Sequence, residues 1–148
     1  DATYGFGYSI IGTAVENNQI EALRELVKRN ADVNSLANHR SYRVFDTLLL
    51  DRIYHQYPDM VYELLQLGAD IKEKDHLGQS AIMLAGGVSK YVGEHNIKIL
   101  LVLRKWVIEQ QIEIIDPYEI TLLDNGDQGS FVRDFAAYTK KQENKYDE

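Results

Sequence analysis

Apolar residues recur every three or four positions in two stretches of the chain, a spacing that places them on one face of an α-helix. In the first stretch these residues are Ile20, Leu23, Leu26 and Val27, and in the second they are Met60, Val61, Leu64 and Leu65. A third stretch, from about Asn96 to Gln110, is strongly apolar and predicts a longer helix. The hydrophobic pattern therefore indicates a helical protein.

The two amphipathic stretches belong to a longer repeated pattern. The segment 30–34 (NADVN) has a close echo at 68–72 (GADIK), 38 residues later. Ser9, Thr47 and Ser80 each precede an apolar segment, at intervals of 38 and 33 residues. A hydroxyl group in such a place can accept a backbone N–H bond and begin a helix. Internal repetition at this period predicts stacked helical units.

These residues resemble the ankyrin repeat, a unit of about 33 residues with a Thr-Pro-Leu-His-x-Ala signature. The clearest match is residues 68–85, GADIKEKDHLGQSAIMLA. Gly68 and Gly78 stand where the family needs left-handed backbone, and Asn30 replaces the first of these glycines. The resemblance implies an all-α solenoid of helix-turn-helix units with hairpin-like fingers and a degenerate C-terminal repeat. It places repeats at about 9–41, 47–79, 80–117 and 118–140 of a single domain 1–148, before a polar tail at 141–148.

The chain also departs from the family signature. Its proline place holds Ile10, Leu48 and Ala81, and its histidine place holds Gly12, Leu50 and Met83. Arg52 stands where the other units have alanine, which suggests a shifted or distorted second repeat. In the last unit Thr121 takes the signature position, and residues 131–138 predict a closing helix.

Charge is distributed unevenly along the chain. There are 23 acidic and 16 basic residues, a net charge of −7, and the interval 109–127 contains six acids and no base. An acidic balance argues against nucleic acid as a partner. A solvated face is the usual explanation for such a run, but without compensating bases it can also steer a basic partner. We therefore assign Glu113, Asp116 and Glu119 to partner binding.

The insertion at residues 39–45 mixes arginine with aromatic residues, the types that are enriched at interaction hot spots. The alternative is a loop whose Tyr42 and Phe45 pack into the core. The resemblance places Asp75 and His76 on a finger, and Tyr91 lies in a glycine-rich connection. The candidate partner-binding residues outside the acidic run are Arg40, Tyr42, Arg43, Asp75, His76 and Tyr91.

The sequence favours no catalytic, metal or cofactor site. Cysteine is absent, and the four histidines lack the spacing of a metal-binding pair. Residues 86–90 lack phosphate-loop spacing, and residues 124–129 lack the spacing of a calcium loop. A carboxylate cluster formed in space by Glu94, Glu109 and Glu113 stays open as an alternative, although no spacing selects it. We expect a protein that is not an enzyme.

The longest aliphatic run, residues 99–103, is far shorter than the roughly 20 residues that span a membrane. Because the chain begins at Asp1, either a cleaved signal peptide or a trimmed terminus is expected, so periplasmic and cytoplasmic locations both stay open. The resemblance implies a monomeric protein-binding module. We expect a small bacterial-type inhibitor or immunity protein that blocks one partner, and an adaptor domain excised from a larger protein is the alternative.

Overall fold

A computed structural model describes residues 3–4, 8–38, 47–75, 77–86 and 94–125 of the chain. This part is mostly helical, as predicted. Its helices are α1 (Ile10–Glu16), α2 (Ile20–Lys28), α3 (Leu48–Tyr54), α4 (Pro58–Gln66), α5 (Ala81–Gly86), α6 (Glu94–Glu109) and α7 (Pro117–Asn125). The sequence did not predict a short antiparallel hairpin of β1 (Thr3–Tyr4) and β2 (Tyr8–Ser9), which leads into α1.

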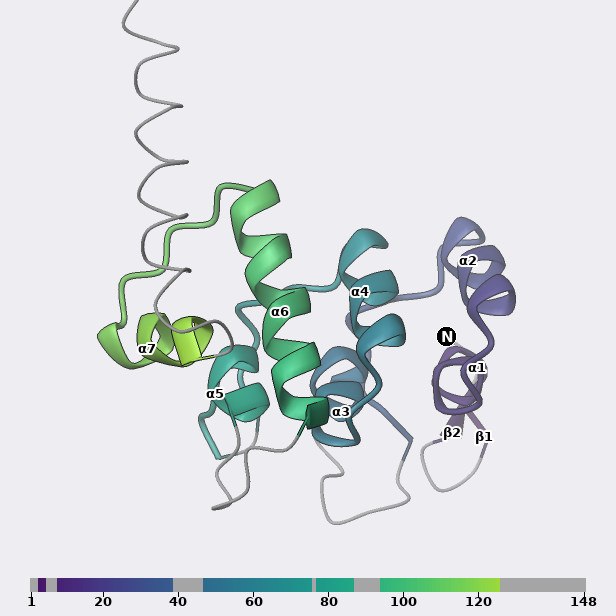
Figure 1. Ribbon diagram of the computed structural model, residues 1–148. Coiled ribbons are helices and arrows are strands. Elements are labelled where there is room, and N and C mark those ends of the chain that lie inside the picture. The colour runs from purple at the N-terminus through teal and green to yellow at the C-terminus, as the bar shows by residue number, and fades with distance from the viewer. Residues whose placement is uncertain (1–2, 5–7, 39–46, 76, 87–93, 126–148) are drawn as a thin grey trace, which may run out of the picture.

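The helices lie in two rows (Figure 1). One row contains α1, α3, α5 and α7, and the other contains α2, α4 and α6. Successive helices pack as the pairs α1–α2, α3–α4 and α5–α6, while α3 contacts α5, α5 contacts α7 and α4 contacts α6. We call each pair a unit. Three units thus follow one another along the chain, and α7 packs on the third.

The predicted N-caps of α1, α3 and α5 are confirmed. Ser9 Oγ accepts from the Gly12 N–H at 2.9 Å, Thr47 Oγ1 from Leu50 at 3.4 Å, and Ser80 Oγ from Met83 at 3.2 Å. Each bond satisfies a donor that the first helical turn leaves without a partner. The same residue position therefore begins the first helix of all three units.

The expectation of a shifted second unit, which was based on Arg52, is wrong. Arg52 lies within α3, only 6% exposed, and its Nη2 is 2.7 Å from Asp51 Oδ2. Its guanidinium also lies over the Tyr57 ring, with Cζ 4.7 Å from the centroid. Because the charge is paired and stacked, arginine can occupy a buried place that the other units give to alanine.

Left-handed backbone recurs at the predicted positions. Asn30 and Gly68, which end the second helices of the first two units, have φ of 72° and 106°. Gln111 ends α6 in the same way, with φ of 54°. The turns inside the first two units use Asn18 and Gln56, with φ of 56° and 66°. Left-handed residues thus follow the second helix of each unit at an equivalent place, although α6 has 16 residues and α2 and α4 have nine each.

A single apolar core runs through the units. Met60, Val61, Leu64 and Leu65 are fully buried, which confirms the predicted face of α4. Leu23 is also buried, but Ile20, Leu26 and Val27 are only partly covered. The difference arises because α4 lies between other helices, whereas α2 ends the row in Figure 1.

Loops with single antiparallel β-bridges connect the units. Leu36 pairs with Thr47 before α3, and Lys74 pairs with Ser80 before α5. We call the loops that contain these bridges finger 1 (residues 34–47) and finger 2 (residues 72–80). The tip of finger 1, at 39–46, and residue 76 lie outside the described residues, as does the predicted closing helix at 131–138.

Candidate partner-binding groove

The third unit ends differently from the first two. After α2 and α4, Asp32 Oδ1 accepts from the Asn34 N–H at 2.8 Å, and Asp70 Oδ1 accepts from the Lys72 N–H at 2.9 Å. Each bond closes a tight turn, because an aspartate carboxylate reaches the backbone two residues on. Glu113 stands at this place after α6, one methylene longer, and residues 112–116 contain no turn.

The third unit also lacks a finger. Asp116 is the last residue of this stretch. It caps α7, since its Oδ1 accepts from the N–H of Tyr118 at 2.8 Å and of Glu119 at 3.4 Å. Pro117 is well suited to the first helical position because its ring fixes φ and it has no N–H to satisfy. Thr121, which takes the signature position in the last unit of the sequence pattern, does not cap the helix. Thr121 lies inside α7 and donates to the Pro117 carbonyl at 2.9 Å.

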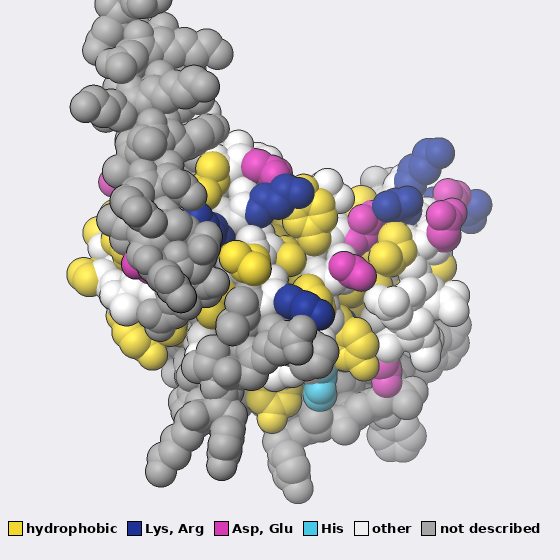
Figure 2. Space-filling model, viewed as in Figure 1, with side chains coloured by type: hydrophobic (Ala, Val, Ile, Leu, Met, Phe, Trp, Pro, Cys, Tyr) yellow, Lys and Arg dark blue, Asp and Glu magenta, His cyan; other side chains and the backbone are white. Residues whose placement is uncertain are grey.

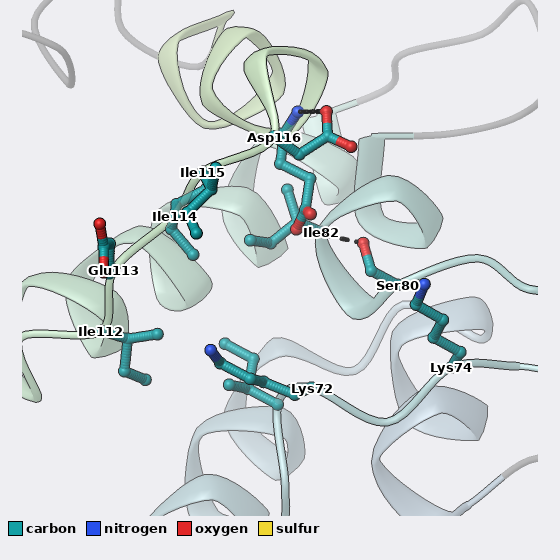
Figure 3. A pocket seen from close by; sticks show the side chains of 11 residues that line it. Lys72, Lys74, Ser80, Ile82, Ile112, Glu113, Ile114, Ile115 and Asp116 are labelled. Atoms are coloured by element: carbon teal, nitrogen blue, oxygen red, sulfur yellow. Dashed lines mark hydrogen bonds between the residues drawn. The ribbon is translucent and has the colours of Figure 1, made fainter.

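A groove of about 300 Å³ lies between finger 2 and the stretch that leads into α7 (Figure 3). Five isoleucines and six polar residues line it: Ile71, Lys72, Lys74, Ser80, Ile82, Ile112, Glu113, Ile114, Ile115, Asp116 and Glu119. Lys72 and Lys74 come from one wall, and Ile112, Ile114 and Ile115 come from the wall opposite. Ile115 is 77% exposed. The walls belong to successive units, so the groove depends on how those units pack.

Lys72 occupies the repeat position that Asn34 occupies after the first unit, where the asparagine hydrogen-bonds to the second unit. In the first unit, Asn34 Oδ1 accepts from the Asp70 N–H at 2.8 Å, and Asn34 Nδ2 donates to the Gly68 carbonyl at 3.3 Å. Lysine has no acceptor atom and cannot make this pair of bonds. Lys72 and Lys74 are exposed, and no ion pair in the described part of the chain uses either ammonium group.

Several acids of the acidic run form contacts within the chain. Glu109 Oε1 lies 3.7 Å from Lys105 Nζ, and its other oxygen accepts from the Tyr62 hydroxyl at 3.4 Å. Asp116 caps α7, and Glu119 accepts from the Ser80 hydroxyl at 3.3 Å. Among the three acids assigned to partner binding, Glu113 alone is fully exposed.

Acidic and basic side chains also lie side by side over α2 and at the upper end of α6 (Figure 2). In α2, Glu25 pairs with Arg29 at 2.9 Å. The equivalent acid of the second unit, Glu63, is only 7% exposed and accepts from both Nε and Nη2 of Arg24. This hydrogen-bonded carboxylate raises the pKa of Arg24 above its ordinary value. The same repeat position therefore forms an exposed ion pair within α2 in the first unit, and in the second unit it joins α2 to α4.

The remaining predicted site residues separate into two groups. Asp75 is only 6% exposed, and its Oδ1 accepts from the N–H of Leu77 at 2.9 Å and of Gln79 at 2.7 Å, which shapes finger 2. The others, Arg40, Tyr42, Arg43, His76 and Tyr91, lie outside the described residues. Sequence reasoning missed Lys72 and Lys74. The signal available in the sequence was the replacement of Asn34 by lysine in the next copy of the repeat.

A second, more polar cavity of about 150 Å³ lies where α1 faces α3, with Asp51, Arg52 and His55 in its lining. His55 Nε2 is 3.5 Å from Asp51 Oδ1. Among the residues that the structure describes, no group of three histidine, aspartate or glutamate side chains is arranged to hold a metal ion. No helix in that same part of the chain combines the length and apolar character that crossing a membrane requires.

The comparisons with protein families and curated proteins identified no relative of this chain. A scan against models of known protein families gives no match, and a search of curated proteins gives none. The candidate site therefore depends on the geometry above, in which the isoleucine-lined groove offers apolar surface and two ammonium groups that pair with none of the described residues.

Proposed function

We propose that this chain is an ankyrin-type protein that acts without catalysis, by binding one specific protein and blocking it. The repeated elements support the ankyrin part of the proposal. Equivalent hydroxyl caps begin α1, α3 and α5, and left-handed residues end α2, α4 and α6. The proposed role is that of an inhibitor or immunity-type protein, with no cofactor and with the chain acting as a monomer.

The observation that carries the binding proposal is the exposed apolar surface of the groove. Ile115 is 77% exposed at its edge, in a molecule whose other groove isoleucines are buried or half-buried. Covering such a side chain is worth up to about 2 kcal/mol, because burial removes apolar area from water. A partner that fills the groove would gain this energy together with contacts to Lys72 and Lys74.

The proposal concerns both the overall charge of the partner and the charge of the group that contacts the groove. The net charge of −7 favours approach of a protein whose overall surface is basic. At short range, Glu113 is the exposed acid on the groove, whereas Asp116 and Glu119 are already hydrogen-bonded within the chain. Contact by a basic group is therefore proposed for Glu113 and not for the other two.

Affinity capture tests the binding proposal. Tagged wild-type chain and Ile115→Asp are incubated with extract from the source cell, and Leu77→Asp is the matched control. Leu77 is 68% exposed and lies on finger 2, but it does not line the groove. We expect a protein that wild type and Leu77→Asp retain and Ile115→Asp loses. Retention of the same proteins by all three chains would contradict the proposal.

The activity of the captured partner separates blocking from scaffolding. An inhibitor abolishes that activity at equimolar ratio, and Ile115→Asp fails to do so. An adaptor, which is the alternative proposal, leaves the activity unchanged and retains a second protein in the same complex. Unchanged activity together with a second captured protein would replace the inhibitor with the adaptor.

A further inference from the structure

The wall of the groove formed by Glu113, Ile114 and Ile115 has free backbone groups. In the described part of the chain, no hydrogen bond uses the N–H or carbonyl groups of these three residues. After α2 and α4, by contrast, the Ser35 N–H bonds to the Asp32 carbonyl at 3.1 Å, and the Glu73 N–H bonds to the Asp70 carbonyl at 3.3 Å. A row of unpaired backbone groups is a template on which another strand can pair.

The opposite wall has complementary features. Lys72 extends across the groove toward Ile112, and Lys74 lies beside Ser80 (Figure 3). Neither lysine forms an ion pair within the described part of the chain. Between the two walls lie Ile71 and Ile82, both buried. A ligand placed here meets hydrogen-bonding groups along one edge, apolar surface below and positive charge at the other edge.

We propose that the groove binds an extended segment of the partner in which aliphatic and acidic residues alternate. The segment pairs its backbone with residues 113–115, as in the recognition mode where a peptide adds a strand to an exposed edge. Successive side chains of a strand point to opposite faces, so alternate residues enter the groove while their neighbours stay at its mouth. Aliphatic side chains then pack on the isoleucines, and carboxylates reach Lys72 and Lys74. This inference depends on the proposed protein-binding function.

The lysine wall favours an acidic segment over a basic one, and the backbone groups of residues 113–115 favour a strand over a helix. Neither ammonium group has a partner among the residues that the structure describes, while two of the three carboxylates on the groove, those of Asp116 and Glu119, accept hydrogen bonds. A carboxylate therefore finds unpaired charge of opposite sign, and a lysine on the ligand would meet like charges at finger 2. A helix satisfies its own backbone groups and would leave those of residues 113–115 unpaired.

A display library of random octapeptides tests the proposal with the full-length chain. The library is selected on wild type and depleted on the triple variant Lys72→Glu, Lys74→Glu, Ile115→Asp. We expect the surviving sequences to alternate aliphatic and acidic residues. No enrichment over the triple variant, or enrichment of basic or helix-forming sequences, would overturn the proposal.

The best enriched peptide is then synthesised and titrated by calorimetry. The double variant Lys72→Glu, Lys74→Glu should weaken binding about tenfold, the change expected when two exposed charge pairs are lost and reversed. Lys28→Glu on α2, an exposed lysine away from the groove, is the matched control and should bind like wild type. A peptide with N-methylated backbone nitrogens in its centre should lose binding, because the strand pairing needs those donors. Equal affinity for the N-methylated peptide would overturn the strand-pairing inference.

The outcomes separate this inference from the proposed function. If Ile115→Asp abolishes binding of the captured partner but the double variant Lys72→Glu, Lys74→Glu does not weaken it, protein binding at the groove is confirmed and the proposed acidic extended segment is wrong. If a peptide of the proposed kind binds but no partner is blocked, the segment stands and the inhibitor role is wrong. Circular dichroism spectra and unfolding midpoints of all variants show whether each one is folded.

Discussion

Replacing Gly86 by alanine tests how closely α7 packs on α5, the contact that positions one end of the groove. Gly86 is the last residue of α5 and is buried. A Cβ atom at this position would lie 2.5 Å from Leu122 Cδ2 and 2.9 Å from Leu122 Cδ1, both inside van der Waals contact. Leu122 is itself buried in the core, so it has little room to move away.

The expected effect is a loss of stability. Overpacking a core site costs about 1–3 kcal/mol, because side chains and backbone must shift. Alanine gains at most about 1 kcal/mol over glycine in a helix, and less at a helix end. Gly86→Ala should therefore lower the free energy of unfolding by about 1–2 kcal/mol in urea denaturation followed by circular dichroism.

A double-mutant cycle assigns the loss to the Leu122 contact. In a Leu122→Ala background the clash is gone, so Gly86→Ala should become neutral or stabilising there. Ala22→Gly, on the exposed surface of α2, measures the helix-propensity contribution separately. If Gly86→Ala has the same effect in both backgrounds, Leu122 does not lie over Gly86 and the packing of α7 described above is refuted.

Three further substitutions, one of them with a control, test single sites by the same urea denaturation. Asp116→Ala should lower the free energy of unfolding by about 1 kcal/mol through loss of the α7 cap, and Glu113→Ala should leave it unchanged; equal effects would contradict the assigned roles. Asn34→Ala should cost about 1 kcal/mol because it removes both bonds to the second unit, and a wild-type midpoint would show that these bonds add nothing. Gly68→Ala should cost about 1–2 kcal/mol, since φ of 106° is strained for alanine, and no loss would mean that the backbone there can relax.

Much of the helical framework could be predicted from the sequence, because it depends on local interactions. Ser9, Thr47 and Ser80 cap helices through a bond that spans three residues, and the apolar face of α4 follows from its own spacing. Asn30 adopts left-handed backbone where its copy in the next repeat is glycine, as the alignment of the repeats predicted. Each of these features needs only neighbouring residues.

Similarity between the repeats was a poor guide where the role of a residue depends on a side chain that packs against it in the folded protein. Arg52 suggested a distorted unit, but its pairing with Asp51 and the Tyr57 ring lets it stay buried. Thr121 takes the signature position of the last unit, yet Asp116, five residues earlier, is the residue that caps α7. The charge of a side chain does not reveal its partner until the chain is folded.

The sequence by itself determined the caps of α1, α3 and α5, the apolar face of α4 and the left-handed residues at 30 and 68, since those features depend on residues a few places apart. The tertiary structure alone decided what the acidic run and the lysines do. It directs Asp116 and Glu119 into hydrogen bonds within the chain, and it places Lys72 and Lys74 on the same groove with no ion pair to any described residue. The groove exists because two segments about 40 residues apart face each other, and that proximity comes from the packing of successive units rather than from either segment's own sequence.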